Sequence, residues 1–383
     1  MDSKLFKSAG IAIGVFVVII FLLFGIASCS GGGSTIYTYE TLQEEMLEIA
    51  KEYYEENPKE LPSEDTDTKT YTLKKMISEE KLDEVPILFG NEEMKCDGSV
   101  TVTNNNGYFI YSPYLNCSAG KKEKYETISL ADKIKEDSLT TEGYGLYQVG
   151  DQYYYRGEIE NNFIKFPGSD KLYRIVGINA DGTIRLIQLD VIRGISWDNR
   201  YNIEFENNDG INEYFVNNID SRLKESLKAE YNDKESWPDE YKALITTQKV
   251  CVGKRSEDDE STDGSIECSK TIDDQLGVLA VYEVLRASLD ENCIATVDYS
   301  CSNYNWMTSL GRSTWLATAD SNSSRYAFKF DGNSIIKSKT YTTSNVFPVF
   351  NIYDKAIYQS GTGTEEDPYV IYMEATTDAE IDE

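Results

Sequence analysis

Histidine is absent from this chain of 383 residues. Its absence excludes a Ser-His-Asp triad, a Cys-His pair and any zinc, copper or haem site with a histidine ligand. Basic residues are also scarce, with 37 Lys plus Arg against 66 Asp plus Glu and a formal net charge of −29. Nucleic acid is therefore not an expected partner, because phosphate binding needs a basic surface. The 40% hydrophobic content still predicts a globular chain, long enough for one large domain or two ordinary ones.

One long apolar run, residues 9–27, contains no charged side chain and follows Lys4 and Lys7. As a helix it would be about 28 Å long, which is close to the thickness of the hydrocarbon core of a bilayer. The two lysines predict that the N-terminus stays inside the cell. We therefore expect residues 35–383 to lie outside the cytoplasmic membrane, attached to it through the N-terminal segment.

Two interpretations of residues 1–28 remain open. They are either a retained single-pass anchor or a lipoprotein signal, because an aliphatic residue and two small residues precede Cys29 as in a lipobox. In the second case Cys29 would be acylated and become the new N-terminus. The apolar run is longer than the usual core of a signal peptide, which favours the retained anchor. Residues 29–38 form a Gly/Ser-rich linker in either case.

The other six cysteines form three local couples in the sequence, and we predict that each couple is a disulfide. The couples are Cys96 with Cys117, Cys251 with Cys268, and Cys293 with Cys301. Many pairings of six cysteines exist, so sequential pairing is a hypothesis. Each couple brackets a segment that reads as a hairpin or loop, and each closure would contribute about 3 kcal/mol in the chain-entropy model. Because there is no CxxC spacing, an oxidising exterior explains these cysteines better than a metal site.

Residues 39–124 are predicted to form a small helical and β-hairpin unit. Apolar positions recur with helical spacing over residues 39–57, and Thr72 is placed to cap a second short helix. Alternating residues on both sides of the turn 104–107 predict a disulfide-closed β-hairpin. The order of apolar segment, helix and disulfide-tied hairpin resembles a type IV pilin or pseudopilin head. It departs from that family because residues 9–27 lack the glutamate that prepilins carry early in the apolar run.

Residues 125–143 are polar and are predicted to be a linker or edge helix, and residues 373–383 an acidic tail. Between them, residues 144–372 alternate β-rich runs with two predicted helices at 211–231 and 274–289. The predicted strands are at residues 172–178, 183–189, 325–330, 334–339 and 346–353. The first two are joined by a loop containing Asp-Gly, which is a strong hairpin signal. The chain as a whole is therefore predicted to be α+β.

Several phrases in this second region occur together in one group of proteins. They are Tyr154-Tyr-Arg-Gly-Glu158, Asn161-Asn162, Tyr173-Arg-Ile-Val176, Asp181-Gly-Thr-Ile-Arg-Leu-Ile187, Leu276-Gly-Val-Leu-Ala-Val-Tyr-Glu283, Trp306-Met-Thr-Ser309, Phe347-Pro-Val-Phe-Asn-Ile352, Gly361-Thr-Gly-Thr364 and Asp367-Pro-Tyr-Val-Ile371. This series resembles an uncharacterised family of bacterial membrane-anchored surface proteins, which is similar in turn to the C-type-lectin-like fold of formylglycine-generating enzymes. The resemblance implies, for residues 144–372, two helices packed on a twisted antiparallel sheet and a role in binding or display at the cell surface.

Neither the resemblance nor the residues predict a catalytic or metal site. Sugar-binding C-type lectins hold Ca²⁺ with Glu-Pro-Asn or Gln-Pro-Asp and Trp-Asn-Asp, and none of these occurs here. Formylglycine-generating enzymes use free cysteines to bind copper, whereas the cysteines here are predicted to pair. The acidic run 257–260 is best interpreted as a solvated loop. We therefore predict no metal, no cofactor and no catalytic residue.

Aromatic residues are the strongest indication of a binding surface, because they give a large contact area at a low entropic cost. The chain has 28 tyrosines and four tryptophans. Trp306 is expected in the core. Trp197 and Trp315 lie in polar, loop-like contexts, so we expect them at the surface as ligand-binding candidates, together with Asp198 and Asn199.

Three functional hypotheses follow. The first is a membrane-anchored extracellular binding or adhesion protein that displays the second region to a protein or glycan ligand. The second is an extracellular enzyme that acts on a polysaccharide through a pair of carboxylates, which needs no histidine. The third is a component of a pilus-like or secretion assembly.

Overall fold

The computed structural model describes residues 37–82, 87–89, 92–105, 107–119, 123–200, 211–298, 305–372 and 375–377. The predicted anchor or signal at 1–28, Cys29, most of the linker and Cys301 lie outside these residues. Over the part of the chain that is described, no helix is both long and apolar enough to cross a membrane. Strands far outnumber helices in the same residues.

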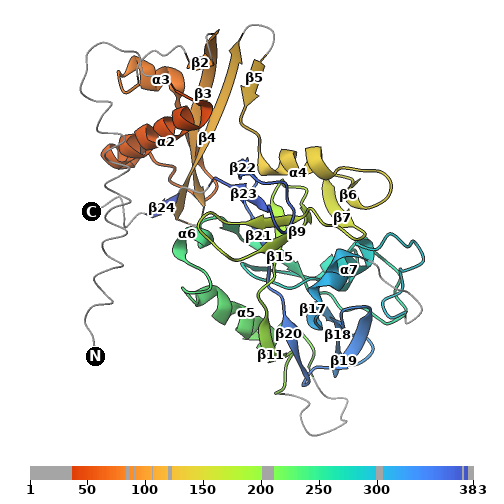
Figure 1. The fold of residues 1–383 in the computed structure, drawn as a ribbon. Helices are drawn as coiled ribbons and strands as arrows, with labels where there is room; N and C mark the ends of the chain where they lie inside the picture. The colour runs from red at the N-terminus through yellow and green to blue at the C-terminus, as the bar shows by residue number, and fades with distance from the viewer. Residues whose placement is uncertain are drawn as a thin grey trace, which may run out of the picture.

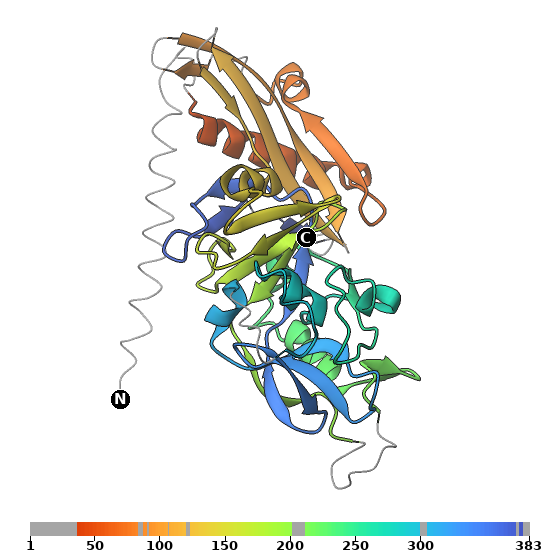
Figure 2. The same cartoon turned by 90° about the vertical axis from the view of Figure 1, so that its right-hand side faces the viewer.

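The N-terminal region is one mixed-length β-sheet covered by two helices. Its strands run in the order β1-β3-β4-β24, with β2 also paired to β3 and β5 to β4. The strand bounds are β1 (Thr68–Thr72), β2 (Ile87–Phe89), β3 (Glu92–Asn105), β4 (Tyr108–Ala119), β5 (Glu123–Glu126) and β24 (Ala375–Thr377). Helix α2 (Tyr39–Glu56) packs along this sheet (Figure 2), and α3 (Leu73–Ser78) follows β1.

Both N-terminal helices were predicted, and α3 begins at the predicted cap residue. Helix α2 buries one apolar face, which includes Leu42, Met46 and Tyr54, against the sheet. Thr72 caps α3, because its side chain accepts a hydrogen bond from the backbone N–H of Lys75. Such a cap satisfies a backbone donor that the helix itself leaves unpaired.

The predicted disulfide hairpin is formed by β3 and β4. Cys96 and Cys117 lie directly opposite each other in the ladder and are bonded. Gly107, in the connecting turn, has a φ of +84°, a conformation that glycine adopts without strain. The long ladder and the covalent bond together fix the register of this hairpin.

The C-terminal region contains two larger sheets and two short ribbons. The largest sheet has nine strands: β6 (Gly145–Val149), β7 (Gln152–Arg156), β8 (Phe163–Lys165), β9 (Tyr173–Ile178), β10 (Ile184–Gln188), β14 (Ile245–Thr246), β21 (Val349–Ile352), β22 (Tyr358–Ser360) and β23 (Tyr369–Ile371). The five-stranded sheet contains β11 (Ile192–Ser196), β17 (Thr314–Ala319), β18 (Tyr326–Phe330), β19 (Ile335–Lys339) and β20 (Thr343–Val346). The ribbons are β12 (Phe215–Val216) with β13 (Ile219–Asp220), and β15 (Gln248–Cys251) with β16 (Thr271–Asp274).

Helices in this region are short. They are α4 (Leu130–Ser138), α5 (Arg222–Asn232), α6 (Asp239–Lys242) and α7 (Val281–Arg286), with single 3₁₀ turns η2 (Glu267–Ser269) and η3 (Trp306–Leu310); a third turn, η1 (Pro58–Glu60), follows α2. Figure 1 shows the N-terminal sheet at one end of the molecule, the nine-stranded sheet in the middle and the five-stranded sheet at the other end.

The predicted fold class is wrong. The described residues are mostly β, and the C-terminal region is not a pair of helices on one twisted antiparallel sheet, because its strands are divided among several sheets. The pairs β8–β23 and β17–β20 are moreover parallel. The predicted hairpin across residues 179–182 is nevertheless present as β9–β10, with Ile178 opposite Ile184.

The two predicted C-terminal helices are much shorter than expected, for local reasons. In the first, Asn217 and Asn218 both have positive φ and form the tight turn of the β12–β13 ribbon, so α5 begins only after Ser221. In the second, Gly277 exchanges two backbone hydrogen bonds of 2.8 Å with Val349, which keeps the segment before α7 extended. An apolar stretch that is buried on all sides does not distinguish a helix from a strand.

Two segments expected at the periphery are parts of the folded structure. Residues 125–143, predicted to be a linker or edge helix, contain helix α4, which buries Leu130 and Ile134 in the C-terminal core. Strand β24, within the predicted acidic tail, pairs with β4 and thereby joins the end of the chain to the N-terminal sheet. The buried apolar residues form two clusters, one in each region, except that Ile110 of β4 belongs to the C-terminal cluster.

Candidate functional site

A polar cavity of about 550 Å³ lies where β10, β15, β21 and α7 meet, and we call it the Arg185 cavity. Its size is within the range of small-molecule sites. The polar and charged residues that line it are Gln152, Asn179, Asp181, Arg185, Thr247, Gln248, Lys249, Asp273, Tyr282, Glu283, Arg286 and Asn351. The cavity therefore presents amides, carboxylates, cations and a phenol to one space.

An ion pair between Arg185 and Glu283 forms the centre of the cavity wall. The Nε of Arg185 lies 2.6 Å from Glu283 Oε1, and its Nη2 lies 3.2 Å from Oε2, so the contact is bidentate. The Nη1 group of Arg185 donates to Gln248 Oε1 at 2.6 Å. The side chains are only 11% and 1% exposed. A bidentate, buried pair of this kind fixes the direction of both side chains.

Strand pairing and the position of α7 bring these residues together from distant parts of the sequence. Arg185 lies on β10 directly opposite Asn351 on β21, and Gln248 begins β15 beside them. Glu283 is in the first turn of α7, where it accepts a hydrogen bond of 2.8 Å from the backbone N–H of Ala280. The carboxylate therefore serves both as a helix cap and as the partner of Arg185.

The ion pair changes the acidity of both partners. Burial alone would raise the pKa of Glu283, but the guanidinium groups of Arg185 and Arg286 hold it below its ordinary value. Burial would likewise lower the pKa of Arg185, but the carboxylate of Glu283 raises it. Both groups are therefore charged at neutral pH.

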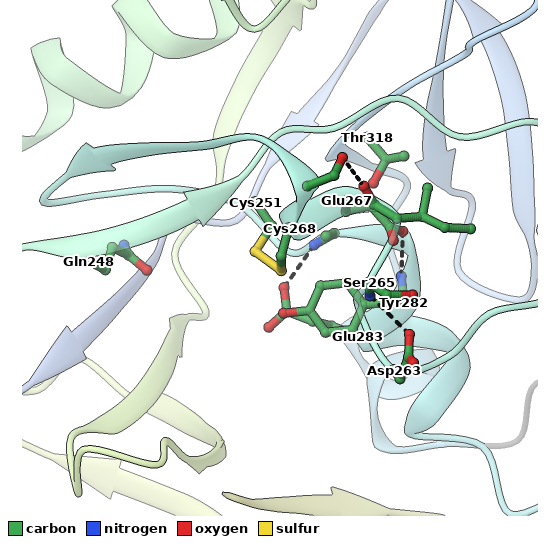
Figure 3. Close-up of a disulfide and its surroundings, with 12 residues drawn as sticks. Gln248, Cys251, Asp263, Ser265, Glu267, Cys268, Tyr282, Glu283 and Thr318 are labelled. Carbon is green, nitrogen blue, oxygen red and sulfur yellow. Dashed lines mark hydrogen bonds between the residues drawn. A yellow bond between two sulfur atoms is a disulfide. The ribbon is translucent and has the colours of Figure 1, made fainter.

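The disulfide Cys251–Cys268 closes one side of the cavity, and Figure 3 shows it with Tyr282 and Glu283 nearby. Behind it, Glu267 accepts hydrogen bonds from the backbone N–H of Tyr282 at 3.0 Å and from Arg255 at 3.2 Å. Burial raises the pKa of Glu267, with Arg255 opposing that shift. The disulfide and this second pair hold the loop between β15 and β16 against α7.

The formal charge of the cavity is balanced. Three cations (Arg185, Lys249 and Arg286) face three carboxylates (Asp181, Asp273 and Glu283), although the whole chain carries −29. Lys249 and Asp273 form a pair of their own at 3.2 Å. Any ligand that enters therefore meets many hydrogen-bonding groups but no net formal charge.

We expect Glu283→Gln to change the pH dependence of stability. The folded-state pKa of Glu283 lies below its ordinary value of 4.5. The stability that the ionised carboxylate contributes is therefore fully present above pH 4.5 and is lost as the pH falls through the lowered pKa. The variant should lose about 2 kcal/mol at pH 7, since it weakens hydrogen bonds to a charged group. Urea unfolding between pH 7 and 3 should show this difference shrinking at the acid end. A difference that stays constant with pH would contradict the assignment; Glu136→Gln is the exposed control.

Trp197 and Trp315 are not at the surface, and this expectation is corrected. Both are fully buried and pack edge to face with ring centroids 6.0 Å apart. Trp315 is on β17, where every residue is buried, and its indole N–H donates to the carbonyl of Ile195 at 2.8 Å. Their polar neighbours Ser196, Asp198 and Thr314 are buried as well, so the polarity of the local sequence did not indicate exposure.

Asp198 and Asn199 also lie outside the Arg185 cavity. Asp198 is buried and accepts hydrogen bonds from Arg200, including one from its Nη2 at 2.5 Å. Its Oδ1 also accepts from the backbone N–H of Arg200 at 3.0 Å, so its geometry is that of a turn-stabilising residue. Asn199 beside it is half-buried.

Two predicted disulfides, Cys96–Cys117 and Cys251–Cys268, are present. Cys293 is also disulfide-bonded, while its predicted partner Cys301 lies outside the described residues. Cys293 lines a smaller cavity of about 210 Å³ near Tyr154.

The residues of the Arg185 cavity were not among the predicted site residues, although a signal for some of them exists. Arg185 and Asn351 each lie between apolar residues of a strand, and a polar residue in such a position needs a buried partner. Which residues provide the partners depends on the fold, because Arg185 and Glu283 are 98 positions apart. Searches against known protein families, curated proteins and solved structures find no match to the chain.

Proposed function

We propose that this chain is a membrane-anchored extracellular binding protein and that its Arg185 cavity holds an uncharged segment of a glycan. The observation that carries the proposal is the combination of balanced charge with fixed donors and acceptors in one cavity. Sugar hydroxyls both donate and accept hydrogen bonds, so they need both kinds of partner side by side. Amides, carboxylates and guanidinium groups held by the Arg185–Glu283 network meet that need.

Two observations support a location outside the cytoplasmic membrane. Disulfides are typical of proteins outside the cytoplasm, and the described residues contain two whose partners are known. The uncharged run at residues 9–27 has the length of a membrane anchor, with lysines on the side expected to stay inside. In this proposal the C-terminal region faces the surroundings of the cell.

Glycoside hydrolysis is a weaker proposal for the same ligand class. It needs two carboxyl groups about 5–9.5 Å apart, one of them an acid with a raised pKa. Burial is the first cause of the raised pKa at both Glu45 and Glu267. Glu45 lies on the exposed side of α2 and Glu267 faces Arg255, so neither lines the Arg185 cavity. These positions favour binding over hydrolysis.

The test is a glycan array probed with the purified full-length chain, followed by titration calorimetry with the best-retained oligosaccharide. Gln152→Ala removes one exposed amide at the cavity and should weaken binding about 2- to 10-fold, as expected for one lost hydrogen bond. Gln148→Ala is the matched control, because Gln148 is also exposed on the β6–β7 hairpin but does not line the cavity.

The proposal fails if no glycan is retained, or if Gln152→Ala and Gln148→Ala bind equally well. Retention of a protein ligand instead, with binding insensitive to Gln152→Ala, would also count against it.

A further inference from the structure

A second cavity, of about 560 Å³, shares no lining residue with the Arg185 cavity, and we call it the Arg174 pocket. Its lining combines polar and charged side chains with the apolar side chains of Phe163, Leu189, Leu310 and Phe347. Arg174, on β9, is 3% exposed and lines the same space. A buried cation is costly unless it is compensated.

The guanidinium of Arg174 is held firmly, but only by neutral oxygens. Its Nε donates to Asn162 Oδ1 at 2.8 Å, its Nη1 to Trp306 O at 3.1 Å and to Ser309, and its Nη2 to Ile159 O at 2.5 Å. These contacts use four of its five N–H groups. The rings of Phe163 and Trp306 lie 4.6 and 5.0 Å from the guanidinium carbon.

Arg174 has no ion pair with a described carboxylate, unlike Arg185 and Arg255. Burial lowers its pKa to about 10, and the nearby charge of Glu365 partly opposes this shift. The group is therefore still cationic at neutral pH, and among the described residues one of its N–H groups has no hydrogen-bond partner and no carboxylate forms an ion pair with it.

Carboxylates stand at the rim of the pocket instead of at its floor. Glu365 and Glu366 are exposed on the loop after Gly363, and Glu160, which also lines the pocket, is exposed too. The loop is fixed by glycines: Gly361 and Gly363 have φ of +92° and +80°, and a Cβ at Gly361 would lie 2.0 Å from the carbonyl oxygen of Pro368. The pocket thus combines one buried cation, several apolar side chains and three exposed carboxylates.

We infer that the Arg174 pocket binds a free amino acid with an apolar side chain. The ligand's α-carboxylate lies toward Arg174, its side chain fills the space between Phe163 and Phe347, and its ammonium group faces the rim glutamates. A phosphate or other dianion is disfavoured, because it meets three carboxylates on entry. A neutral sugar would leave both the guanidinium and the rim without a partner of opposite charge. This site is separate from the Arg185 cavity, so the inference does not rest on glycan binding.

The test is titration calorimetry of the full-length chain with L-leucine and L-phenylalanine. N-acetyl-leucine, leucinamide and inorganic phosphate serve as comparison ligands. Leucine or phenylalanine should bind, and removal of either charged group of the ligand should weaken binding about tenfold or more, as expected for a lost charge-assisted contact. Equal binding of leucine and N-acetyl-leucine, or no binding by either amino acid, would overturn the inference.

Substitutions at the rim glutamates and at Arg174 test separately what each contributes to binding. Glu365→Gln with Glu366→Gln should weaken leucine binding and strengthen that of N-acetyl-leucine, while oligosaccharide binding at the Arg185 cavity stays unchanged. Glu235→Gln is the control, because Glu235 is an exposed glutamate away from the pocket. Arg174→Met should abolish leucine binding. If that variant does not fold, the Glu365→Gln/Glu366→Gln variant alone tests the inference. Leucine affinity that is unchanged in the rim variant contradicts the inference.

Discussion

Arg255→Met is expected to lower the free energy of unfolding by about 3–5 kcal/mol, because it leaves the Glu267 carboxylate buried without its counterion. Both side chains are 0% exposed, and the two Nη1 contacts to the carboxylate are 3.2 and 3.4 Å. Arg255 also donates to the carbonyl of Asp259 at 2.8 Å, so it ties the acidic run 257–260 to the core. Urea unfolding followed by circular dichroism measures the loss.

A double variant provides the control for this prediction. Arg255→Met with Glu267→Met removes both charges and should lose less stability than Arg255→Met alone, since no unpaired charge stays buried. A loss below about 1 kcal/mol in the single variant would show that the pair is not buried as described.

Trp197→Ala is expected to cost about 3–5 kcal/mol of stability, which is typical of a large aromatic residue removed from a core. Trp197 is 0% exposed and packs against both Tyr214, at 5.9 Å between centroids, and Trp315. The substitution should leave a cavity between α5 and the five-stranded sheet. Guanidinium unfolding measured by fluorescence tests this directly.

The same experiment distinguishes a core residue from a ligand-binding one. Tyr144→Ala, at a tyrosine that is 59% exposed, should cost less than about 1 kcal/mol. If Trp197→Ala lost as little stability as Tyr144→Ala but abolished ligand binding, Trp197 would be a surface ligand-binding residue and not a core residue.

Local signals in the sequence predicted the local structure well. The period of apolar residues placed α2, the threonine before Leu73 placed the start of α3, and an Asp-Gly loop placed the β9–β10 hairpin. Each of these signals acts between residues close in sequence, so the rest of the fold changes them little. The two disulfides with known partners belong to the same class, because each closes a short segment.

Long-range pairing is what the sequence did not reveal. The extended segment at Gly277 depends on Val349, and the burial of Trp315 depends on a strand more than a hundred positions away, at Ile195. Neither contact can be recognised from the neighbouring residues in the sequence. Strand β21 illustrates the same limit: a proline before a strand is typical of a sheet edge or a bulge, yet β21 starts just after Pro348 and pairs with both β10 and β14.

The candidate sites are assembled from such distant residues. The phrases that suggested a surface-protein family contain Arg174, Arg185, Glu283 and Trp306, yet none of these was predicted as a site residue. Arg174 on β9 and Trp306 in η3 are 132 positions apart and meet only in the folded chain. Sequence patterns marked the segments, and only the fold shows which side chains share a cavity.

The most direct test of the glycan-binding proposal is a crystal structure of the protein with the oligosaccharide that it retains best. We expect a sugar ring in the Arg185 cavity, with hydroxyl groups within about 3 Å of polar side chains such as Gln152 and Lys249, and with the Arg185–Glu283 pair intact. A sugar bound elsewhere on the molecule, or a cavity that holds only water at saturating oligosaccharide, would contradict the proposal.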